Sequence, residues 1–306
     1  MSKVLRENSV SEITLFKVYP GIELIYYKFD VPNFNLDTLT TEDIMEISHC
    51  RKGRVECELQ DGTYLYLGEG DLGINMMNNH ALAMDFPVQY YEGISVNLNM
   101  SVLKYNLPEI LDSESFDINK IKEKLCRNDG CFVMRTTEKI EHIFSELYSI
   151  PDEIKGPYLK IKVIELLLFM SVFDKTVSEK KGNYYKIHVD TVKRIKKEIT
   201  ENYSKRYTID ELSKEHCISP TTLKMYFKEV YGATINAFMK NYRMKKAAQL
   251  LRETSDSIGD VAYKVSYESQ SKFAKAFRDV YEMSPIEYRK KCLVGNNTML
   301  EEGKNE

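Results

Sequence analysis

Two rhythms of apolar residues divide the chain. Up to about residue 100, short runs rich in Ile, Val, Tyr and Leu alternate with turn residues at intervals of about ten residues. The runs are ITLFKVY, IELIYYKF, IMEISHC, RVECELQ, TYLYLG, LGINMM and ISVNLNM. They predict β-strands in a small barrel or sandwich over roughly residues 10–100. Gln60-Asp61-Gly62-Thr63, between two of the runs, predicts a hairpin.

After residue 100 the apolar positions recur at helical spacing. The segments SVLKYNLPEIL, NKIKEKL, TEKIEHIFSELYSI and PYLKIKVIELLLFMSVFDK predict helices within residues 101–181. The last segment is apolar on nearly every side, so we expect it to be buried, either within one subunit or between two. The polar residues 178–186, which include Gly182, fit an exposed linker.

One pattern occurs twice between residues 182 and 292. Apolar positions 223, 227, 230 and 231 fall at i, i+4, i+7 and i+8, which predicts a helix with one buried stripe. The stretch Ser219–Lys240 recurs as Ser269–Lys290, with identical residues at Ser219/Ser269, Phe227/Phe277, Val230/Val280, Tyr231/Tyr281 and Lys240/Lys290. The helix is therefore duplicated together with its stripe.

Each copy follows a shorter helix with a recognisable start. Thr208-Ile-Asp-Glu211 is a capping box, and Ser257-Ile-Gly-Asp260 is a related one. Ser219-Pro220 opens the next helix with a cap and a proline that needs no hydrogen bond there. Two short helices joined by a tight turn have the lengths of a DNA-binding helix-turn-helix, although a plain helical bundle fits the same pattern.

The helix predicted between the two copies sets their separation. It runs from Thr234 to about Arg252 and is roughly 27 Å long. Because the DNA helical repeat is roughly 34 Å, such a helix can hold two recognition helices about one turn of DNA apart.

Charge is distributed unevenly over the chain. The formal net charge is −3, but Tyr184–Cys292 contains 22 Lys and Arg against 14 Asp and Glu, and the remainder is acidic. A basic end joined to an acidic one suggests that the C-terminal end binds a polyanion. For any single basic residue of this end, a solvated helix face is the favoured interpretation.

Length and composition fit about two globular domains, since the chain has 306 residues, 43% of them hydrophobic. The N-terminus MSKVLRENSV lacks the apolar core of a signal peptide, and the most apolar run, VIELLLFMSVF, is about half a membrane span. We therefore expect neither export nor membrane insertion. The scattered cysteines favour a reducing, cytoplasmic compartment: they are Cys50, Cys57, Cys126, Cys131, Cys217 and Cys292.

The segment from about Asp190 to Lys291 resembles the tandem helix-turn-helix domain of the AraC/XylS family of bacterial transcription regulators. The resemblance rests on AAQLL, IGDVAYKVSYESQSKFAKAFRDVY and SPIEYR. It implies an effector-responsive regulator that binds double-stranded promoter DNA and RNA polymerase, as a homodimer. By position, the DNA-binding residues are Thr221, Thr222, Lys224 and Met225 in the first recognition helix, and Gln270, Ser271, Lys272 and Lys275 in the second.

Two departures from the family pattern bear on DNA readout. Met225 lies where many relatives have arginine, so we expect no bidentate guanine contact there. The glycine usual in each turn is replaced by Cys217 and Ser266, which leaves open whether the turns use a positive φ.

Residues 62–80, GTYLYLGEGDLGINMMNNH, resemble the cupin-like sensor domain of the same family. The matching positions are Gly68, Gly70, Asp71, Leu72 and His80. The resemblance implies a barrel that binds a small effector, and the candidate ligand-binding residues are His80, Met84, Tyr90, Tyr91 and Glu92. A peptide, a sugar or no ligand at all remains an alternative.

The sequence disfavours an enzyme. Metal-dependent cupin enzymes resemble one another in a His-x-His pair, where this chain has His49-Cys50-Arg51, and His80 has no partner at metal-ligand spacing. No cysteine has the Pro-Cys-His setting of alkyl-transfer repair proteins. We expect no catalytic residue, metal or cofactor; the alternatives are a metal-dependent cupin enzyme or a thiol-based repair protein fused to a DNA-binding domain.

The predicted fold class is multi-domain α+β. A cupin-like β-barrel spans residues 1–100, and a helical linker or dimerisation region spans residues 101–181. An all-α domain with two helix-turn-helix motifs spans residues 182–292, followed by a disordered tail over residues 293–306.

Overall fold

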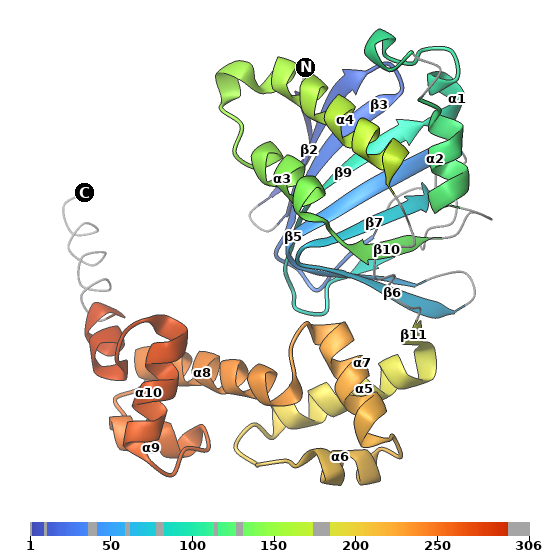
Figure 1. Cartoon of the computed structure of the whole chain (residues 1–306). Coiled ribbons are helices and arrows are strands. Elements are labelled where there is room, and N and C mark those ends of the chain that lie inside the picture. Colours follow the sequence, from blue (N-terminus) through green and yellow to red (C-terminus); the bar gives the residue numbers. More distant parts are fainter. Residues whose placement is uncertain are drawn as a thin grey trace, which may run out of the picture. The chain divides into compact units, whose positions relative to one another are not determined.

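A computed structural model describes residues 2–8, 11–35, 42–58, 62–77, 83–112, 116–126, 131–173 and 184–292 (Figure 1). The chain divides into two compact units, Met1–Lys186 and Ile187–Glu306. The N-terminal unit is rich in sheet and the C-terminal unit is helical. His80, the Gln60-Asp61 turn and the predicted tail lie outside the described residues.

An antiparallel sheet forms the N-terminal unit, in the order β1, β2, β3, β9, β5, β6, β11, with β7 and β8 also paired to β5. The strands predicted from the sequence are confirmed, but IMEISHC and most of RVECELQ join into the single strand β5. The bounds are β1 (Ser2–Asn8), β2 (Ser11–Tyr19), β3 (Ile22–Phe29), β4 (Asn33–Asn35), β5 (Ile44–Glu58), β6 (Thr63–Gly68), β7 (Asp71–Met76), β8 (Ala83–Asp85), β9 (Tyr91–Asn99), β10 (Phe132–Arg135) and β11 (Tyr184–Tyr185).

Strand β5 bends, so that it belongs to both halves of the sheet. Its first part pairs with β7 and β9, and its last part pairs with β6. The ladder shifts register between Cys50 and Lys52, and the next residue, Gly53, has φ +81°. A Cβ at Gly53 would lie 2.0 Å from the carbonyl oxygen of Tyr90. Glycine is therefore required where the strand turns.

The central strands present different chemistry on their two faces, because successive side chains point to opposite sides of a sheet. On β5, Met45 and Ile47 join the main apolar core, whereas Glu46 and Ser48 line a cavity. Strands β7 and β9 repeat the alternation, with Ile74, Val96 and Leu98 in the core and Asn75 and Ser95 at the cavity.

Helices cover the apolar face of the sheet. They are α1 (Met100–Leu103), α2 (Ile118–Leu125), α3 (Glu138–Leu147) and α4 (Lys155–Val172), with the 3₁₀ turns η2 (Glu109–Leu111) and η4 (Asp152–Ile154). Phe144 and Leu167 are fully buried in the same core as the strands. The apolar segment in α4 is thus buried largely within the unit.

One local prediction in the helical segment was wrong, and one strand was not predicted. SVLKYNLPEIL forms α1 and η2 instead of one helix, because Pro108 donates no hydrogen bond and keeps Leu107 out of the helical region. Phe132–Arg135 forms β10, which pairs with β7 from Phe132↔Ile74 to Arg135↔Asp71. The edge of β7 supplies the hydrogen-bond partners of β10. A stretch of four residues is too short for its own sequence to predict such a pairing.

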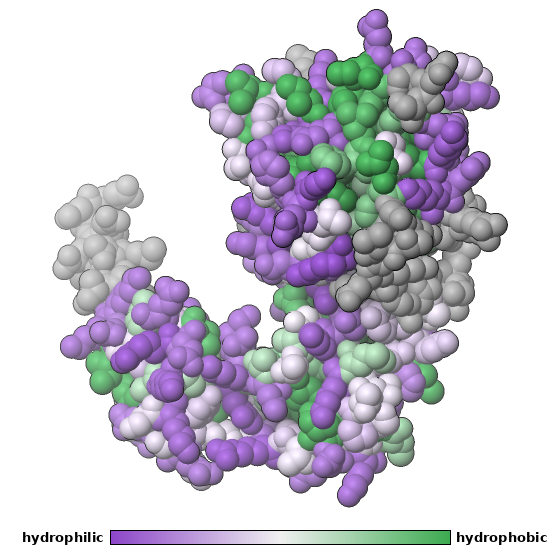
Figure 2. Space-filling model, in the orientation of Figure 1, coloured by the Kyte–Doolittle hydropathy of each residue, from purple (hydrophilic) through white to green (hydrophobic). Residues whose placement is uncertain are grey.

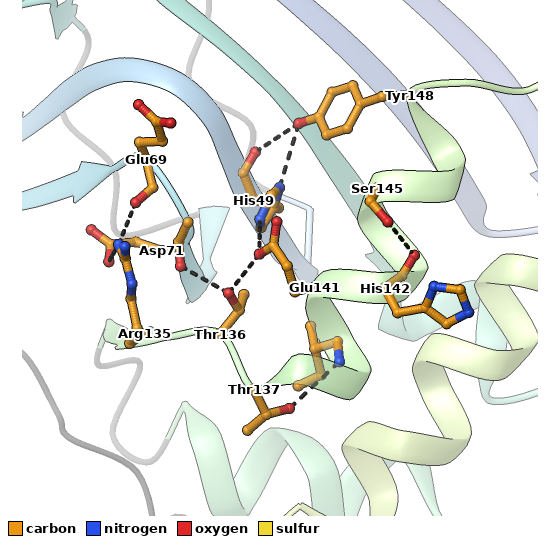
Figure 3. A network of polar contacts seen from close by, with 12 residues as sticks. His49, Glu69, Asp71, Arg135, Thr136, Thr137, Glu141, His142, Ser145 and Tyr148 are labelled. Carbon is orange, nitrogen blue, oxygen red and sulfur yellow. Dashed lines mark hydrogen bonds and ion pairs between the residues drawn. The ribbon is translucent and has the colours of Figure 1, made fainter.

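A polar network ties the sheet to α3 (Figure 3). His49 on β5 is 1% exposed, and its Nε2 lies 3.1 Å from Oε2 of Glu141. Its ring stacks on Phe144 with centroids 4.5 Å apart. The hydroxyl of Thr136 donates either to Glu141 (2.7 Å) or to the carbonyl oxygen of Gly70 (2.9 Å). His49 therefore faces the helices and lies on the opposite side of the sheet from the cavity.

The C-terminal unit contains two short helix pairs joined through a long helix. The first pair is α6 (Ile209–Glu215) and α7 (Pro220–Tyr231), and the second is α9 (Ile258–Lys264) and α10 (Gln270–Tyr281). α5 (Lys186–Glu201) precedes them and α8 (Ile235–Glu253) connects them. Both predicted capping boxes and the Ser219-Pro220 start are confirmed.

The sequence repeat is also a repeat of aromatic contacts. In the first pair, the ring centroid of Phe227 lies 4.8 Å from that of Tyr231 and 5.5 Å from that of Phe238 in α8. The second copy has Phe277–Tyr281 at 4.6 Å and Phe277–Tyr288 at 5.4 Å. Each outer helix is thus fixed to the helix that follows it by three aromatic rings at equivalent positions.

Both turns use a left-handed residue that is not glycine. Cys217 has φ +51° and Ser266 has φ +71°. Both turns therefore have the backbone conformation usual for glycine, although neither residue is a glycine. The left-handed conformation of a residue with a Cβ costs about 1–2 kcal/mol at each position.

Helix α4 exposes apolar side chains on its outer side, at Ile161, Leu168 and Val172. Figure 2 shows apolar residues gathered over this part of the N-terminal unit. No helix within the described ranges is both long enough and apolar enough to cross a membrane.

We predict that His49 makes stability fall in mild acid. Burial lowers the pKa of His49 below its ordinary value, and Glu141 acts in the opposite direction. The unfolded imidazole, with pKa about 6.5, thus takes up a proton before the folded one does. The free energy of unfolding is unaffected above this pH and falls below it, at most by about 1.4 kcal/mol per pH unit, until the folded pKa is reached. Urea unfolding between pH 7.5 and 5 measures the slope, which should flatten in His49→Gln.

The matched control is His142→Gln, which removes an exposed histidine from α3 and should leave the slope unchanged. Equal slopes in His49→Gln and the unmodified protein would contradict the prediction.

We also predict that Cys217→Gly and Ser266→Gly stabilise the C-terminal unit. Each substitution removes the strain of a left-handed residue that has a Cβ. Glycine also gives the unfolded chain more backbone entropy, so the free energy of unfolding should rise by a net amount of about 0.5–1 kcal/mol. Ser271→Gly, in the exposed first turn of α10, is the matched control and should lose about 0.5–1 kcal/mol. Thermal unfolding measures all three, and a loss of stability in both turn variants would refute the strain.

Candidate nucleic-acid interface and cavity

The two outer helices expose the residues that the sequence analysis assigned to DNA. On α7, Thr221 and Lys224 are exposed and Met225 is 50% exposed, on the side opposite the buried Leu223 and Phe227. On α10, the exposed residues are Gln270, Ser271, Lys272 and Lys275. Each helix therefore presents one polar face to solvent and one apolar face to its unit.

Thr222 has a role within the fold. Its hydroxyl lies 2.7 Å from the hydroxyl of Ser219, and its backbone N–H donates to Ser219 Oγ (3.1 Å). The side chain is half-buried, so it is less available than its neighbours for contact with a base.

Arg243 in α8 holds the loop before α6. Its Nε donates to the carbonyl oxygen of Tyr203 (2.8 Å) and its Nη2 to that of Lys205 (2.9 Å). Burial lowers the pKa of Arg243, but a guanidinium stays protonated at any physiological pH. From the same loop, Arg206 donates to the carbonyl oxygen of Ser266 (3.3 Å) in the turn of the second pair. These contacts link the two helix pairs.

A basic hollow lies at the start of α10. Its empty volume is about 680 Å³ including the open mouth, and it is lined by Arg206, Arg243, Ser266, Tyr267, Glu268, Ser269 and Lys272. Ser269 caps α10, so the N–H groups of the helix start lie beside three cationic side chains. The positive end of a helix dipole adds to that charge, and the hollow suits an anion.

The N-terminal cavity has an empty volume of about 750 Å³, which includes its open mouth. Of the candidate ligand residues, Met84 and Tyr91 line it. Tyr90 and Glu92 do not: the hydroxyl of Tyr90 donates to Glu92 (2.9 Å), and Glu92 pairs with Arg51 at 2.8 Å.

Sequence reasoning missed most of the cavity lining. Tyr27, Glu46, Ser48, Asn75 and Ser95 all line it. The available signal was a polar residue at every second position of otherwise apolar strands, as in IMEISHC and ISVNLNM. Such alternation is usually assigned to a solvent-exposed face, and only the bend of β5 encloses it.

Two groups that line the cavity have raised pKa values. Burial, with the charges of Glu46 and Glu56, raises the pKa of Cys57 to about 12. Burial, followed by the charge of Glu46, also raises the pKa of Tyr27. Neither group loses its proton at neutral pH.

Comparisons with known proteins centre on the C-terminal unit. The family model described as a helix-turn-helix domain matches residues 212–291. The HTH-type transcriptional regulator MtrA of Neisseria gonorrhoeae is 37% identical over 84 residues, which are 28% of this chain and 28% of that protein. The lactose operon transcription activator of Staphylococcus xylosus is 27% identical over 164 residues, which are 52% of this chain and 58% of that protein.

Among solved structures, the C-terminal domain of AraT, a response regulator from Geobacillus stearothermophilus, is 29% identical. The match covers 33% of this chain and 84% of that chain, with a TM-score of 0.32. For the two curated regulators, the match to this chain spans less than two thirds of their length. Residues 212–291, which include both outer helices, therefore match the helix-turn-helix domain of a known family and are similar to the corresponding part of HTH-type transcriptional regulators.

Proposed function

We propose that this chain is a sequence-specific, DNA-binding transcription regulator in which both helix pairs act as helix-turn-helix motifs. The observation that carries the proposal is the repeated aromatic packing, which presents α7 and α10 in equivalent ways on their following helices. Helix α8 has 19 residues and is about 28 Å long, which suits two helices in successive major grooves.

The two recognition helices contribute differently to readout. On α10, Gln270 suits an adenine edge, and Lys272 and Lys275 suit guanine edges or phosphates. On α7, Met225 offers only apolar contact, such as with a thymine methyl group, which leaves Thr221 and Lys224 as its polar readers. We infer that α10 carries the greater share of base discrimination.

The basic hollow at the start of α10 is the proposed phosphate site. A backbone phosphate there would meet the N-terminus of the helix and the cationic groups of Arg206 and Lys272. Such a contact fixes the position of α10 on the duplex without reading sequence.

The N-terminal unit is the proposed sensor. Its curled sheet and cavity support a cupin-like barrel that binds a small effector. The exposed stripe on α4, with Ile161, Leu168 and Val172, supports a homodimer interface. An effector that prefers the DNA-competent state would raise promoter occupancy and contact with RNA polymerase.

A binding function is favoured over an enzyme. His49, which the metal-enzyme alternative would need in the cavity, stacks on Phe144 on the helix-covered face instead. The thiol of Cys57 in the cavity has a raised pKa, the reverse of an activated nucleophile. Both curated relatives are named as transcription regulators.

We predict that Gln270→Ala and Lys275→Ala each weaken binding to the chain's own upstream intergenic DNA by about 5- to 150-fold, because each removes a contact worth about 1–3 kcal/mol. Fluorescence anisotropy at several salt concentrations, with a scrambled duplex of equal length, measures the effect. Loss of a base contact should leave the scrambled duplex nearly unaffected, whereas loss of a phosphate contact should weaken both duplexes and lower the salt slope.

Lys120→Ala, which removes an exposed lysine from α2, is the control and should bind as the unmodified protein does. If the unmodified protein binds its own and the scrambled duplex equally at every salt concentration, with and without candidate effectors, the proposed function fails.

A further inference from the structure

The loop between α5 and α6, residues 202–207, precedes the first helix pair but contacts the second (Figure 1). Nη2 of Arg206 donates to the carbonyl oxygen of Ser266 (3.3 Å) and lies 3.5 Å from Oε1 of Glu268. Ser266 is the left-handed residue of the turn between α9 and α10, and Ser269 caps α10 shortly after it. Arg206 therefore holds the backbone directly before the second outer helix.

The same loop is fixed to α8, the helix that connects the two pairs. Arg243 donates through Nε to the carbonyl oxygen of Tyr203 (2.8 Å) and through Nη2 to that of Lys205 (2.9 Å). Its guanidinium is half-buried, and hydrogen bonds from a charged donor are stronger than those between neutral groups. The ring of Tyr203 packs against the apolar cluster that α8 shares with α9 and α10. The loop is thus a fixed base from which Arg206 extends.

A connecting helix alone does not fix how two helix pairs are oriented. Helix α8 sets the distance between the outer helices, but long helices curve, and a small change in curvature moves one end relative to the other. A contact made away from the axis of α8, directly between the two pairs, opposes such a change. Arg206 makes a contact of this kind, because it joins the loop before α6 to the turn before α10.

The orientation of the two pairs decides which DNA sites they can bind together. Two recognition helices on one rigid support need a fixed separation between the DNA segments that they enter. One extra base pair between the segments shifts the second segment by roughly 3.4 Å and turns it by roughly 35°. The side chains of α10 then lose their base contacts unless the second pair can follow the displaced segment.

We propose that Arg206 is a positioning residue, which fixes the spacing between the two DNA segments that this chain accepts. The proposal rests on the proposed function, in which α7 and α10 both enter major grooves. It adds a determinant of spacing that lies outside both recognition helices and acts through the turn before α10. A phosphate contact of Arg206 affects all sites alike, whereas the positioning role affects one spacing more than another.

The test compares the upstream site with a duplex that carries one extra base pair between the two segments, which footprinting locates. Fluorescence anisotropy of the full chain gives the ratio of the two dissociation constants, in which the loss of a phosphate contact cancels. We expect the unmodified protein to bind the lengthened site about tenfold more weakly, because α10 loses base contacts there. The ratio should fall to about threefold or less in Arg206→Ala, in which the second pair can follow the segment.

Two further variants separate positioning from loss of charge. Arg206→Lys keeps a donor for the carbonyl oxygen of Ser266 and should restore part of the preference. Lys214→Ala, which removes an exposed lysine from α6, is the control and should keep the ratio of the unmodified protein. Arg206 is itself exposed, so its replacement should leave the fold intact. Equal ratios in Arg206→Ala and the unmodified protein overturn the proposal, as does a ratio near one in the unmodified protein.

A second measurement needs no DNA. Spin labels attached through an unnatural amino acid in place of Met225 and Ser271, both on exposed faces, report the distance between α7 and α10 by pulsed electron paramagnetic resonance. The labelled chain is diluted with unlabelled protein, so that only distances within one chain are measured. We expect a narrow distance distribution with Arg206 present and a broader one in Arg206→Ala. Equally narrow distributions overturn the positioning role.

The two measurements separate this inference from the proposed function. Specific binding to the upstream DNA with equal spacing ratios means that the regulator stands and the positioning role fails. A broader distance distribution in Arg206→Ala without specific DNA binding under any condition means that Arg206 positions α10 but the regulator fails, and with it the proposed spacing of DNA segments.

Discussion

The aromatic contact between each outer helix and the helix that follows it is the constraint on which the C-terminal unit depends. Phe227, Tyr231 and Phe238 meet within about 5.5 Å, and Phe277, Tyr281 and Tyr288 do the same. Aromatic rings contribute more buried area than other side chains and favour tilted or edge-on contacts, so they fix orientation as well as distance. A surface that reads DNA needs both, because its residues must reach base edges at set positions.

Helix α8 connects the two helix pairs and makes contacts with both of them. Its Lys240 pairs with Asp279 of α10 at 2.8 Å, and Arg243 holds the loop before α6 through two carbonyl oxygens. An exposed ion pair contributes little stability, but hydrogen bonds from a half-buried guanidinium to backbone carbonyls are charge-assisted and directional. The spacing between α7 and α10 is thus set by backbone contacts as well as by helix length.

In the N-terminal unit, the alternation of side chains along the strands separates an apolar core from a cavity. Its central strands give one face to the helices and the other to a cavity, and Gly53 allows β5 to turn and enclose that cavity. Polar residues such as Glu46 and Ser48 are therefore buried without entering the apolar core. This separation lets one sheet combine a stable apolar core with a partly polar cavity.

Local signals in the sequence determined the elements of this protein: strand alternation, the capping boxes at Thr208 and Ser257, and the duplicated helix with its exposed face. These depend on neighbours within a few residues, so periodicity and capping predict them. The tertiary structure alone decided the strand β10, the left-handed conformations of Cys217 and Ser266, the bracing role of Arg243 and the polar part of the cavity lining around Glu46. Each of these requires a partner distant in the sequence or a backbone conformation imposed by packing, and a linear pattern carries no record of which distant groups will meet.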